Sequence, residues 1–225
     1  MGKNTFGAKL LVYASVQFVV LTSGAMFLYP GGAMYEPNAK RYLFFQNFFS
    51  DLGATLTRTK ESNLYSMLLF IVALGSIGTS LAVASPLWKR VIVGEGRTMA
   101  FGHAAQALSL LSGICYVGIA LTPWNLVLGV HMLFVQGAFT LLLGFVICLT
   151  VMEVQNNWPV RYIASNIVYI AILTTYVFVL FHGPNLLTFR GLVFQVIAQK
   201  IIVYISILNL AYQCLSLLTP KKTAL

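Results

Sequence analysis

Six long runs of apolar residues, separated by short polar segments, make up most of the chain. The runs cover residues 8–29, 64–85, 101–122, 126–151, 160–182 and 189–218. A helix that crosses the roughly 30 Å hydrocarbon core of a membrane needs about 20 mostly apolar residues, because each residue adds about 1.5 Å. The pattern therefore predicts a single all-α domain over residues 1–225, a bundle of six transmembrane helices with one long outer loop between the first two.

Proline and tryptophan positions support these boundaries. All seven prolines lie at or outside the ends of the runs, where a missing N–H costs least: Pro30, Pro37, Pro86, Pro123, Pro159, Pro184 and Pro220. All three tryptophans lie at run ends as well, as an aromatic belt at the membrane surface requires: Trp88, Trp124 and Trp158. The first run carries a passable cleavage site at Ser23-Gly24-Ala25, but it is long for a signal peptide, and we expect an uncleaved helix.

Charge is scarce in this chain. Only 8% of residues are charged and 59% are apolar, against roughly 25% charged in a soluble domain. This composition excludes a soluble enzyme and a disordered protein. The net charge of +9 does not indicate a nucleic-acid partner, because the basic residues lie in loops between apolar runs.

The distribution of the basic residues predicts the orientation. If the N-terminus is cytoplasmic, the inner side holds Lys3, Lys9, Lys89, Arg90, Arg97, Arg161, Lys221 and Lys222, and the outer side holds Lys40, Arg41, Arg58, Lys60 and Arg190. This bias favours an integral multi-pass membrane protein with both termini cytoplasmic.

One ionisable residue lies in the middle of a predicted helix. Lys200 is 11 residues past Phe189, about 16 Å along the helix axis and near mid-membrane. Gln195, Gln199 and Tyr204 lie within a turn or so of it, and together they form a polar patch. We predict either a ligand-binding site or a structural lysine that pairs with a carboxylate or with backbone carbonyls.

The sole aspartate of the chain, Asp51, lies in the aromatic-rich loop 30–63. This loop either lies in the outer interface or dips into the bundle, and Asp51 either caps a short helix or takes part in chemistry. His131 and His182 are predicted on the same outer side. Asp51 and His131 are therefore candidates for an acid–base pair, with Ser50 as a candidate nucleophile, although the sequence does not establish that they meet.

We find neither a set of metal ligands nor a cofactor-binding motif in the sequence. A metal site needs three or more His, Cys, Asp or Glu side chains together, whereas one aspartate and scattered histidines predict none. Cys115, Cys148 and Cys214 all lie inside runs, where we interpret them as apolar packing residues. We therefore expect no metal and no cofactor.

Three short motifs carry a resemblance to a known family. The run Asn47-Phe-Phe-Ser-Asp-Leu-Gly-Ala54, followed by Asn63, resembles the Ser-Asp-Leu-Gly signature of a family of bacterial and archaeal six-span membrane proteins of unknown function. Gly118…Pro123 followed by His131, and Gln199-Lys200…Tyr204, resemble two further parts of its pattern. The family is distantly similar to the Frag/DRAM/Sfk group.

The resemblance implies a lipid-related role and a bacterial or archaeal cytoplasmic membrane. The positions that it marks are Ser50, Asp51, Gly53, Asn63, His131 and Lys200. Lysine stands here where the family more often has arginine, and a lysine lacks the bidentate fork that recognises phosphate.

Three hypotheses follow. The first is a protein that binds or handles a lipid or small amphiphile in a polar cavity facing the outer leaflet; its candidate ligand-binding residues are Lys200, Gln195, Gln199, Tyr204, Asn63 and His182. The second is an intramembrane acyl hydrolase or transferase that uses Asp51, His131 and Ser50. The third is a structural subunit that packs against a membrane-protein partner or a second copy of the chain.

Overall fold

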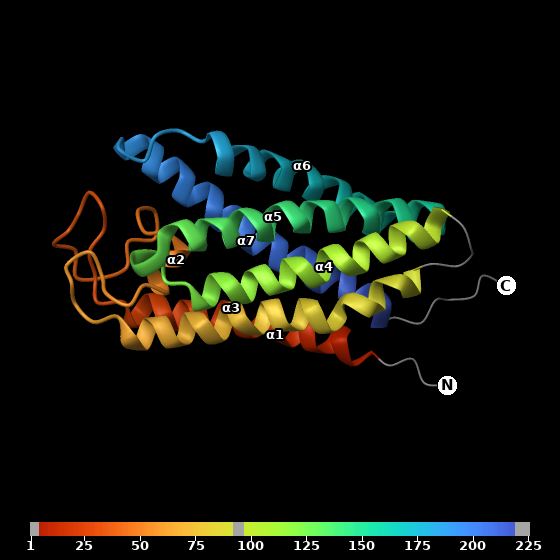
Figure 1. The fold of residues 1–225 in the computed structure, drawn as a ribbon, viewed down its shortest axis with the longest axis horizontal. Helices are drawn as coiled ribbons and strands as arrows, with labels where there is room; N and C mark the ends of the chain where they lie inside the picture. The colour runs from red at the N-terminus through yellow and green to blue at the C-terminus, as the bar shows by residue number, and fades with distance from the viewer. Residues whose placement is uncertain (1–4, 92–96, 219–225) are drawn as a thin grey trace.

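The structure, a computed structural model, describes residues 5–91 and 97–218. In chain order its helices are α1 (Phe6–Leu28), α2 (Phe49–Leu52), α3 (Leu64–Ala84), the 3-10 helix η1 (Ser85–Val91), α4 (Arg97–Leu121), α5 (Trp124–Gln155), α6 (Val160–His182) and α7 (Phe189–Leu218) (Figure 1). Six of them are long and apolar enough to cross a membrane. The predicted all-α bundle of an integral multi-pass membrane protein is confirmed.

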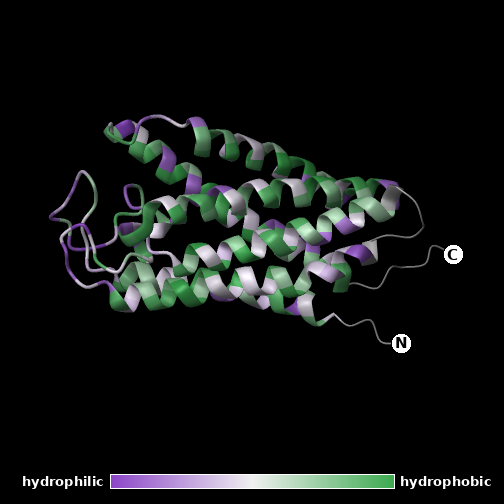
Figure 2. Cartoon of the chain, in the orientation of Figure 1, coloured by the Kyte–Doolittle hydropathy of each residue, from purple (hydrophilic) through white to green (hydrophobic). Residues whose placement is uncertain are grey.

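The long helices pack as a closed ring of neighbours. α1 contacts α3, α3 contacts α4, α4 contacts α5, and α6 follows α5; α7 then packs on both α6 and α1. Hydrophobic residues cover the length of these helices, whereas hydrophilic residues gather in the loop between α1 and α3 (Figure 2). Large apolar side chains such as Phe27 and Val160 point outward and are exposed, as lipid-facing residues must be.

Helix boundaries follow the prolines. Pro123 and Pro159 immediately precede α5 and α6, and Pro184 follows the end of α6. Two of the tryptophans do not form a lipid-facing belt: Trp88 is buried with its ring 5.0 Å from that of Phe145, and Trp158 is buried too. The ends of these helices are covered by other parts of the chain, which the one-dimensional pattern does not reveal.

The loop between α1 and α3 dips into the bundle. Its short helix α2 buries Phe49, whose ring lies 6.0 Å from that of Phe18 in α1 and 5.5 Å from that of Tyr204 in α7. Phe18 is ten residues before the end of α1, about 15 Å along its axis. Irregular backbone at such a depth is tolerated only where protein surrounds it or where it lines a cavity.

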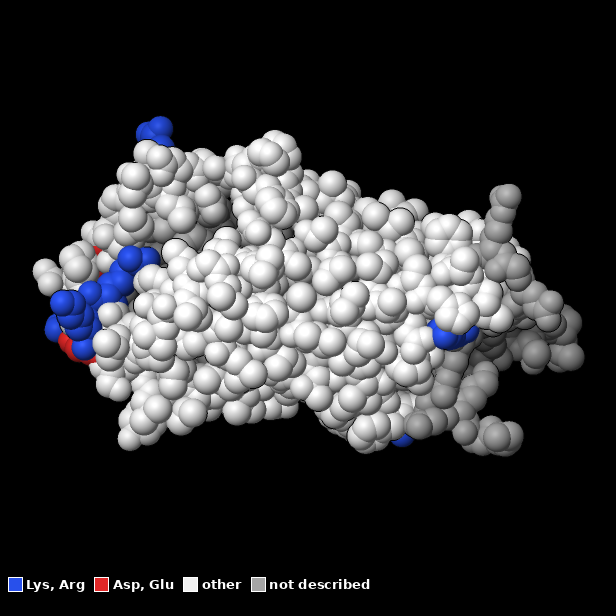
Figure 3. Space-filling view, in the orientation of Figure 1, with Lys and Arg blue, Asp and Glu red and all other residues white. Residues whose placement is uncertain are grey.

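The two ends of the bundle differ. The loop and α2 lie at one end, which we call the loop end, whereas α1 begins and α7 ends at the opposite end, which we call the far end (Figure 1). The charged side chains of the loop gather at the loop end (Figure 3). Part of the orientation argument falls outside the described residues, namely Lys3, Lys221 and Lys222, and the side chains of Arg90 and Arg97 are likewise not described. The side of the membrane that each end faces stays a prediction.

Candidate functional site

Asn47 is the centre of the hydrogen bonds that fold the loop. Its side chain is completely buried and donates to the Gly32 carbonyl and to Asp51 Oδ2, both at 3.0 Å. Its Oδ1 accepts the backbone N–H of Leu43 at 3.0 Å, and its own carbonyl accepts the Tyr42 hydroxyl at 2.9 Å. A primary amide suits this position because it offers donors and acceptors at once.

Asp51 caps the short helix α2. Its Oδ2 also accepts the backbone N–H of Phe48 at 3.0 Å. Phe48 is the N-cap residue of α2, so Asp51 caps the helix from its third position and not as the N-cap residue itself. The side chain is buried, and this burial raises the pKa of the Asp51 carboxyl above its ordinary value, against the opposing effect of the hydrogen bond from Asn47. Arg58 and Lys200 also favour its ionised form, but neither forms an ion pair with it among the described residues.

Asn63 joins the end of α2 to the start of α3. Its Nδ2 donates to the Leu52 carbonyl at 3.0 Å and to the Ala54 carbonyl at 2.9 Å. Gly53 lies so close to α3 that a Cβ there would be 2.6 Å from the ring of Phe70. These two residues of the marked motif therefore position the loop, and neither of them lines either of the two cavities described next.

Lys200 holds the loop from the side of α7. Its Nζ donates a hydrogen bond to the Asn47 carbonyl. It also lies 5.3 Å, 4.9 Å and 5.5 Å from the ring centroids of Tyr42, Phe44 and Phe49. A buried ammonium group needs such partners, since an unpaired charge in this environment is costly. Of the two predicted roles, the structural lysine on a backbone carbonyl matches these contacts, and Lys200 lines neither cavity.

A cavity of about 360 Å³ lies at the loop end between the loop, α5, α6 and α7. The molecular surface is hollowed beside α6 at this end (Figure 3). The polar residues that line the cavity are Ser50, Asp51, Arg58, His131, Gln195 and Gln199. Most of the remaining wall is apolar and comes from residues such as Leu128, Leu180 and Leu187. We call this space the loop-end cavity.

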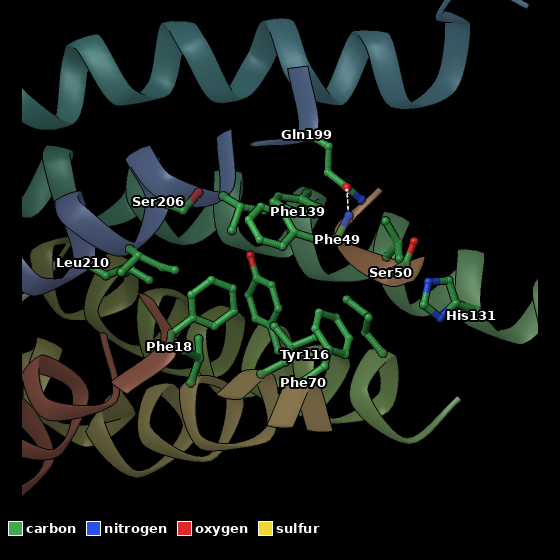
Figure 4. A pocket seen from close by; sticks show the side chains of 16 residues that line it. Phe18, Phe49, Ser50, Phe70, Tyr116, His131, Phe139, Gln199, Ser206 and Leu210 are labelled. Atoms are coloured by element: carbon green, nitrogen blue, oxygen red, sulfur yellow. Dashed lines mark hydrogen bonds between the residues drawn. The ribbon is translucent and has the colours of Figure 1, made fainter. Parts of the chain in front are cut away.

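A smaller space of about 50 Å³ lies deeper in the bundle, behind the same wall. It is lined mainly by aromatic and aliphatic side chains, among them Phe18, Phe70 and Phe139 (Figure 4). Four residues line both spaces: Ser50, His131, Val135 and Gln199. These residues thus form the partition between a partly polar cavity and an apolar one.

His131 is held in one tautomer by the backbone. Its Nδ1 lies 2.7 Å from the Thr122 carbonyl, which can only accept, so the Nδ1 carries the proton and Nε2 is left as an acceptor. Ser50 lies beside His131 on the partition (Figure 4), and its hydroxyl makes no hydrogen bond among the described residues. Asp51 and His131 line the same cavity, but no hydrogen bond joins them.

Gln195 and Gln199 of α7 reach the loop-end cavity while bonded to the backbone. Gln199 Oε1 accepts the N–H of Phe49 at 2.8 Å, and Gln195 Nε2 donates to the Pro184 carbonyl at 2.7 Å. The other two expected ligand-binding residues line neither space. Tyr204 packs against Phe49, and His182 is exposed with its ring stacked 5.0 Å from that of Phe178.

Arg58 is the cavity residue that sequence reasoning missed, since it was counted only as a loop charge. Its guanidinium lies 5.1 Å from the ring centroid of Trp124 at the start of α5, and both residues line the loop-end cavity. No sequence pattern connects a loop arginine to a tryptophan 66 residues later. Among the described residues, no three His, Cys, Asp or Glu side chains gather as a metal site would require.

Comparisons with known proteins add no name to this site. No family model, no curated protein and no solved structure matches the chain. The geometry of the loop-end cavity therefore carries the functional argument.

Proposed function

We propose that this protein binds one lipid or small amphiphile in the loop-end cavity. The observation that carries the proposal is a cavity of about 360 Å³ with a polar set of side chains on one part of its wall and apolar residues, mostly of α5 and α6, on the rest. Ligand cavities of proteins typically have volumes of roughly 300–1,000 Å³ and this kind of lining. Since a whole bilayer lipid is larger than the cavity, we expect the head group and the first part of a chain to be held.

The polar residues suit a head group that accepts hydrogen bonds. Arg58 supplies a guanidinium near the entrance, where it is fixed over Trp124, and a guanidinium can bind a phosphate or carboxylate in bidentate fashion. Lys200, which the family resemblance marks, is bonded to the Asn47 carbonyl. In this proposal Arg58 therefore supplies the contact to the phosphate. We propose an anionic or zwitterionic lipid of the outer leaflet, in a bacterial or archaeal cytoplasmic membrane.

A cavity-filling substitution tests the proposal. Leu180 is half-buried and lines the cavity, whereas Ile167 on the same helix is 56% exposed and lines neither space. Native mass spectrometry of the purified protein is expected to show a retained lipid. Leu180→Trp is expected to lower its occupancy about tenfold, because filling the space removes contacts worth about 0.8 kcal/mol for each methylene. Ile167→Trp is expected to leave it unchanged.

Two results would count against lipid binding at this place. One is the absence of retained lipid in folded wild-type protein and in folded Ile167→Trp. The other is equal retention by Leu180→Trp and Ile167→Trp, which would move the lipid to the outer surface of the bundle.

A second candidate function is acyl hydrolysis or transfer, favoured by the Ser50 and His131 arrangement. In this mechanism His131 Nε2 removes the Ser50 hydroxyl proton while Oγ attacks an ester carbonyl carbon, and the lipid alcohol leaves with that proton. Water or a second alcohol then attacks the acyl-serine and releases the acyl group. Because Asp51 is bonded within the loop, the Thr122 carbonyl takes the role of orienting His131.

A fluorophosphonate probe separates this enzyme from a binding protein. We expect the probe to form an adduct on Ser50 that is absent from Ser50→Ala and much weaker in His131→Gln. Ser23→Ala is the matched control, because the Ser23 hydroxyl is bonded to the Val19 carbonyl on an exposed helix face. A wild-type protein without an adduct would exclude the serine mechanism and leave the binding proposal standing.

A further inference from the structure

Glu153 is a buried acid that the sequence pattern places outside the membrane. The fourth apolar run ends at residue 151, but α5 continues to Gln155, and the Glu153 side chain is only 1% exposed. It lies near the far end of the bundle, well away from the loop-end cavity. No part of the proposed function uses it.

Glu153 is bonded to a chain of two amides that connects three helices. Its Oε2 accepts Asn166 Nδ2 of α6 at 2.9 Å, and Asn166 Oδ1 accepts Asn209 Nδ2 of α7 at 2.9 Å. Both asparagines are buried. Asn166 thus donates to the carboxyl group through its nitrogen and accepts from Asn209 through its oxygen.

No cation compensates Glu153 among the described residues. Arg161 on α6 directs its guanidinium to the Tyr162 ring, 4.8 Å away, and to the Tyr162 hydroxyl at 3.2 Å. Lys89 in η1 forms no ion pair with Glu153 either, and the side chains of α7 near the asparagines are the uncharged Tyr212 and Gln213. An isolated carboxylate is very costly to bury, whereas a neutral carboxylic acid with a hydrogen-bond donor on its carbonyl oxygen is not.

The chain of amides reaches an open cavity on the side of the bundle. Asn209 also lines a separate open cavity of about 260 Å³ between α6 and α7, together with Ser165, Tyr169 and Tyr212. Asn166 is six residues from the start of α6, about 9 Å along the axis, so the acid lies within two turns of the far end. Polar side chains thus extend from the acid to an opening in the bundle.

We propose that Glu153, Asn166 and Asn209 form a proton-binding site in which the Glu153 carboxyl group carries an exchangeable proton at neutral pH. Loss of this proton leaves a negative charge between α5, α6 and α7 that no cation of the described residues pairs with. That charge needs water, a cation or a rearrangement of these helices, so proton occupancy is linked to how the three helices pack. The same three helices form most of the wall of the loop-end cavity.

Infrared spectroscopy of the full-length protein tests the site directly. The wild-type spectrum minus that of Glu153→Gln at pH 7 is expected to contain the C=O band of a protonated carboxylic acid, and this band should shift in D₂O. Asn166→Leu removes the donor to Oε2, so the band should move to higher frequency. The matched control is Glu61→Gln in the exposed part of the loop, which should leave the acid band in place.

A difference spectrum with only carboxylate bands would show that Glu153 is ionised and would overturn the proposal, as would an acid band that does not respond to D₂O. A chemical measurement covers the case in which Glu153→Gln does not fold. A lipid-soluble carbodiimide modifies protonated carboxyl groups, and peptide mapping of the wild-type protein should find the adduct at Glu153. Unmodified Glu153 in folded protein would also overturn the proposal.

Discussion

The buried amide of Asn47 accounts for much of what holds the loop in the bundle. It bonds to Gly32, Leu43 and Asp51, and its carbonyl receives both the Tyr42 hydroxyl and the Lys200 ammonium. Lys200 is the one charge near the middle of an apolar helix, and its contacts explain why it is tolerated there: the loop brings a carbonyl and three aromatic rings to it. Lys200 and Asp51 therefore both help to hold the loop in place through their hydrogen bonds with Asn47.

Asp51 predicts a pH dependence of stability. Because burial raises the pKa of its carboxyl group, the ionised form opposes folding; this contribution is absent below the ordinary Asp value of about 3.9 and grows as the pH rises through the raised value. Asp51→Asn keeps an oxygen that can accept Asn47 and Phe48. We expect thermal unfolding measured between pH 4 and pH 8 to show that the stability of Asp51→Asn relative to the wild type increases as the pH rises.

The test depends on how the difference in stability between the wild type and Asp51→Asn changes with pH. A variant that is less stable than the wild type by the same amount at every pH would indicate a lost hydrogen bond and not the titration of Asp51.

At the scale of elements, two glycines set the distance between α3 and α4. A Cβ on Gly78 would lie 2.5 Å from the Gly113 carbonyl oxygen, and a Cβ on Gly113 would lie 2.6 Å from the Gly78 carbonyl oxygen. Small residues allow this close approach, as in many membrane helix pairs. The small residues at these two positions therefore serve packing within the chain.

A pair of substitutions one turn apart on α3 tests this contact. Gly78→Ala is expected to lower the unfolding free energy by about 1–3 kcal/mol, because the new methyl group meets backbone atoms of α4. Gly75→Ala meets no atom within 4 Å and is expected to be neutral or to stabilise the helix by up to about 1 kcal/mol. Denaturation in detergent measures both. Equal effects would show that helix propensity alone governs these positions.

At the scale of the whole molecule, six long helices bring the start of α1 and the end of α7 to the same end of the bundle (Figure 1). The loop with Lys40, Arg41, Arg58 and Lys60 lies at the other end. The proposal that the loop-end cavity binds a lipid of the outer leaflet depends on the orientation that the basic residues predict.

Cysteine labelling in intact cells tests this orientation. In a chain whose three cysteines are replaced by alanine, Arg41→Cys is expected to react with a membrane-impermeant maleimide added outside the cells. Val160→Cys, exposed at the start of α6 at the far end, is expected to react only after the membrane is permeabilised. The reverse pattern would turn the protein over and move the loop-end cavity to the inner leaflet.

The sequence alone determined the six helices, their approximate ends and the all-α class. Apolar run length, proline positions and charge density are properties of a segment by itself, and the membrane converts them directly into spanning helices. The pattern also singled out Ser50, His131, Gln195 and Gln199, which do line the loop-end cavity.

Only the tertiary structure decided what the polar residues contact. It paired Lys200 with a carbonyl 153 positions earlier, brought Arg58 to Trp124, and buried Glu153 beside Asn166 and Asn209 at an end that the apolar pattern assigned to solvent. Such contacts join residues on different helices and loops. They depend on which helices are neighbours and on how deeply the loop enters the bundle, and neither property is written in the hydropathy of any single segment.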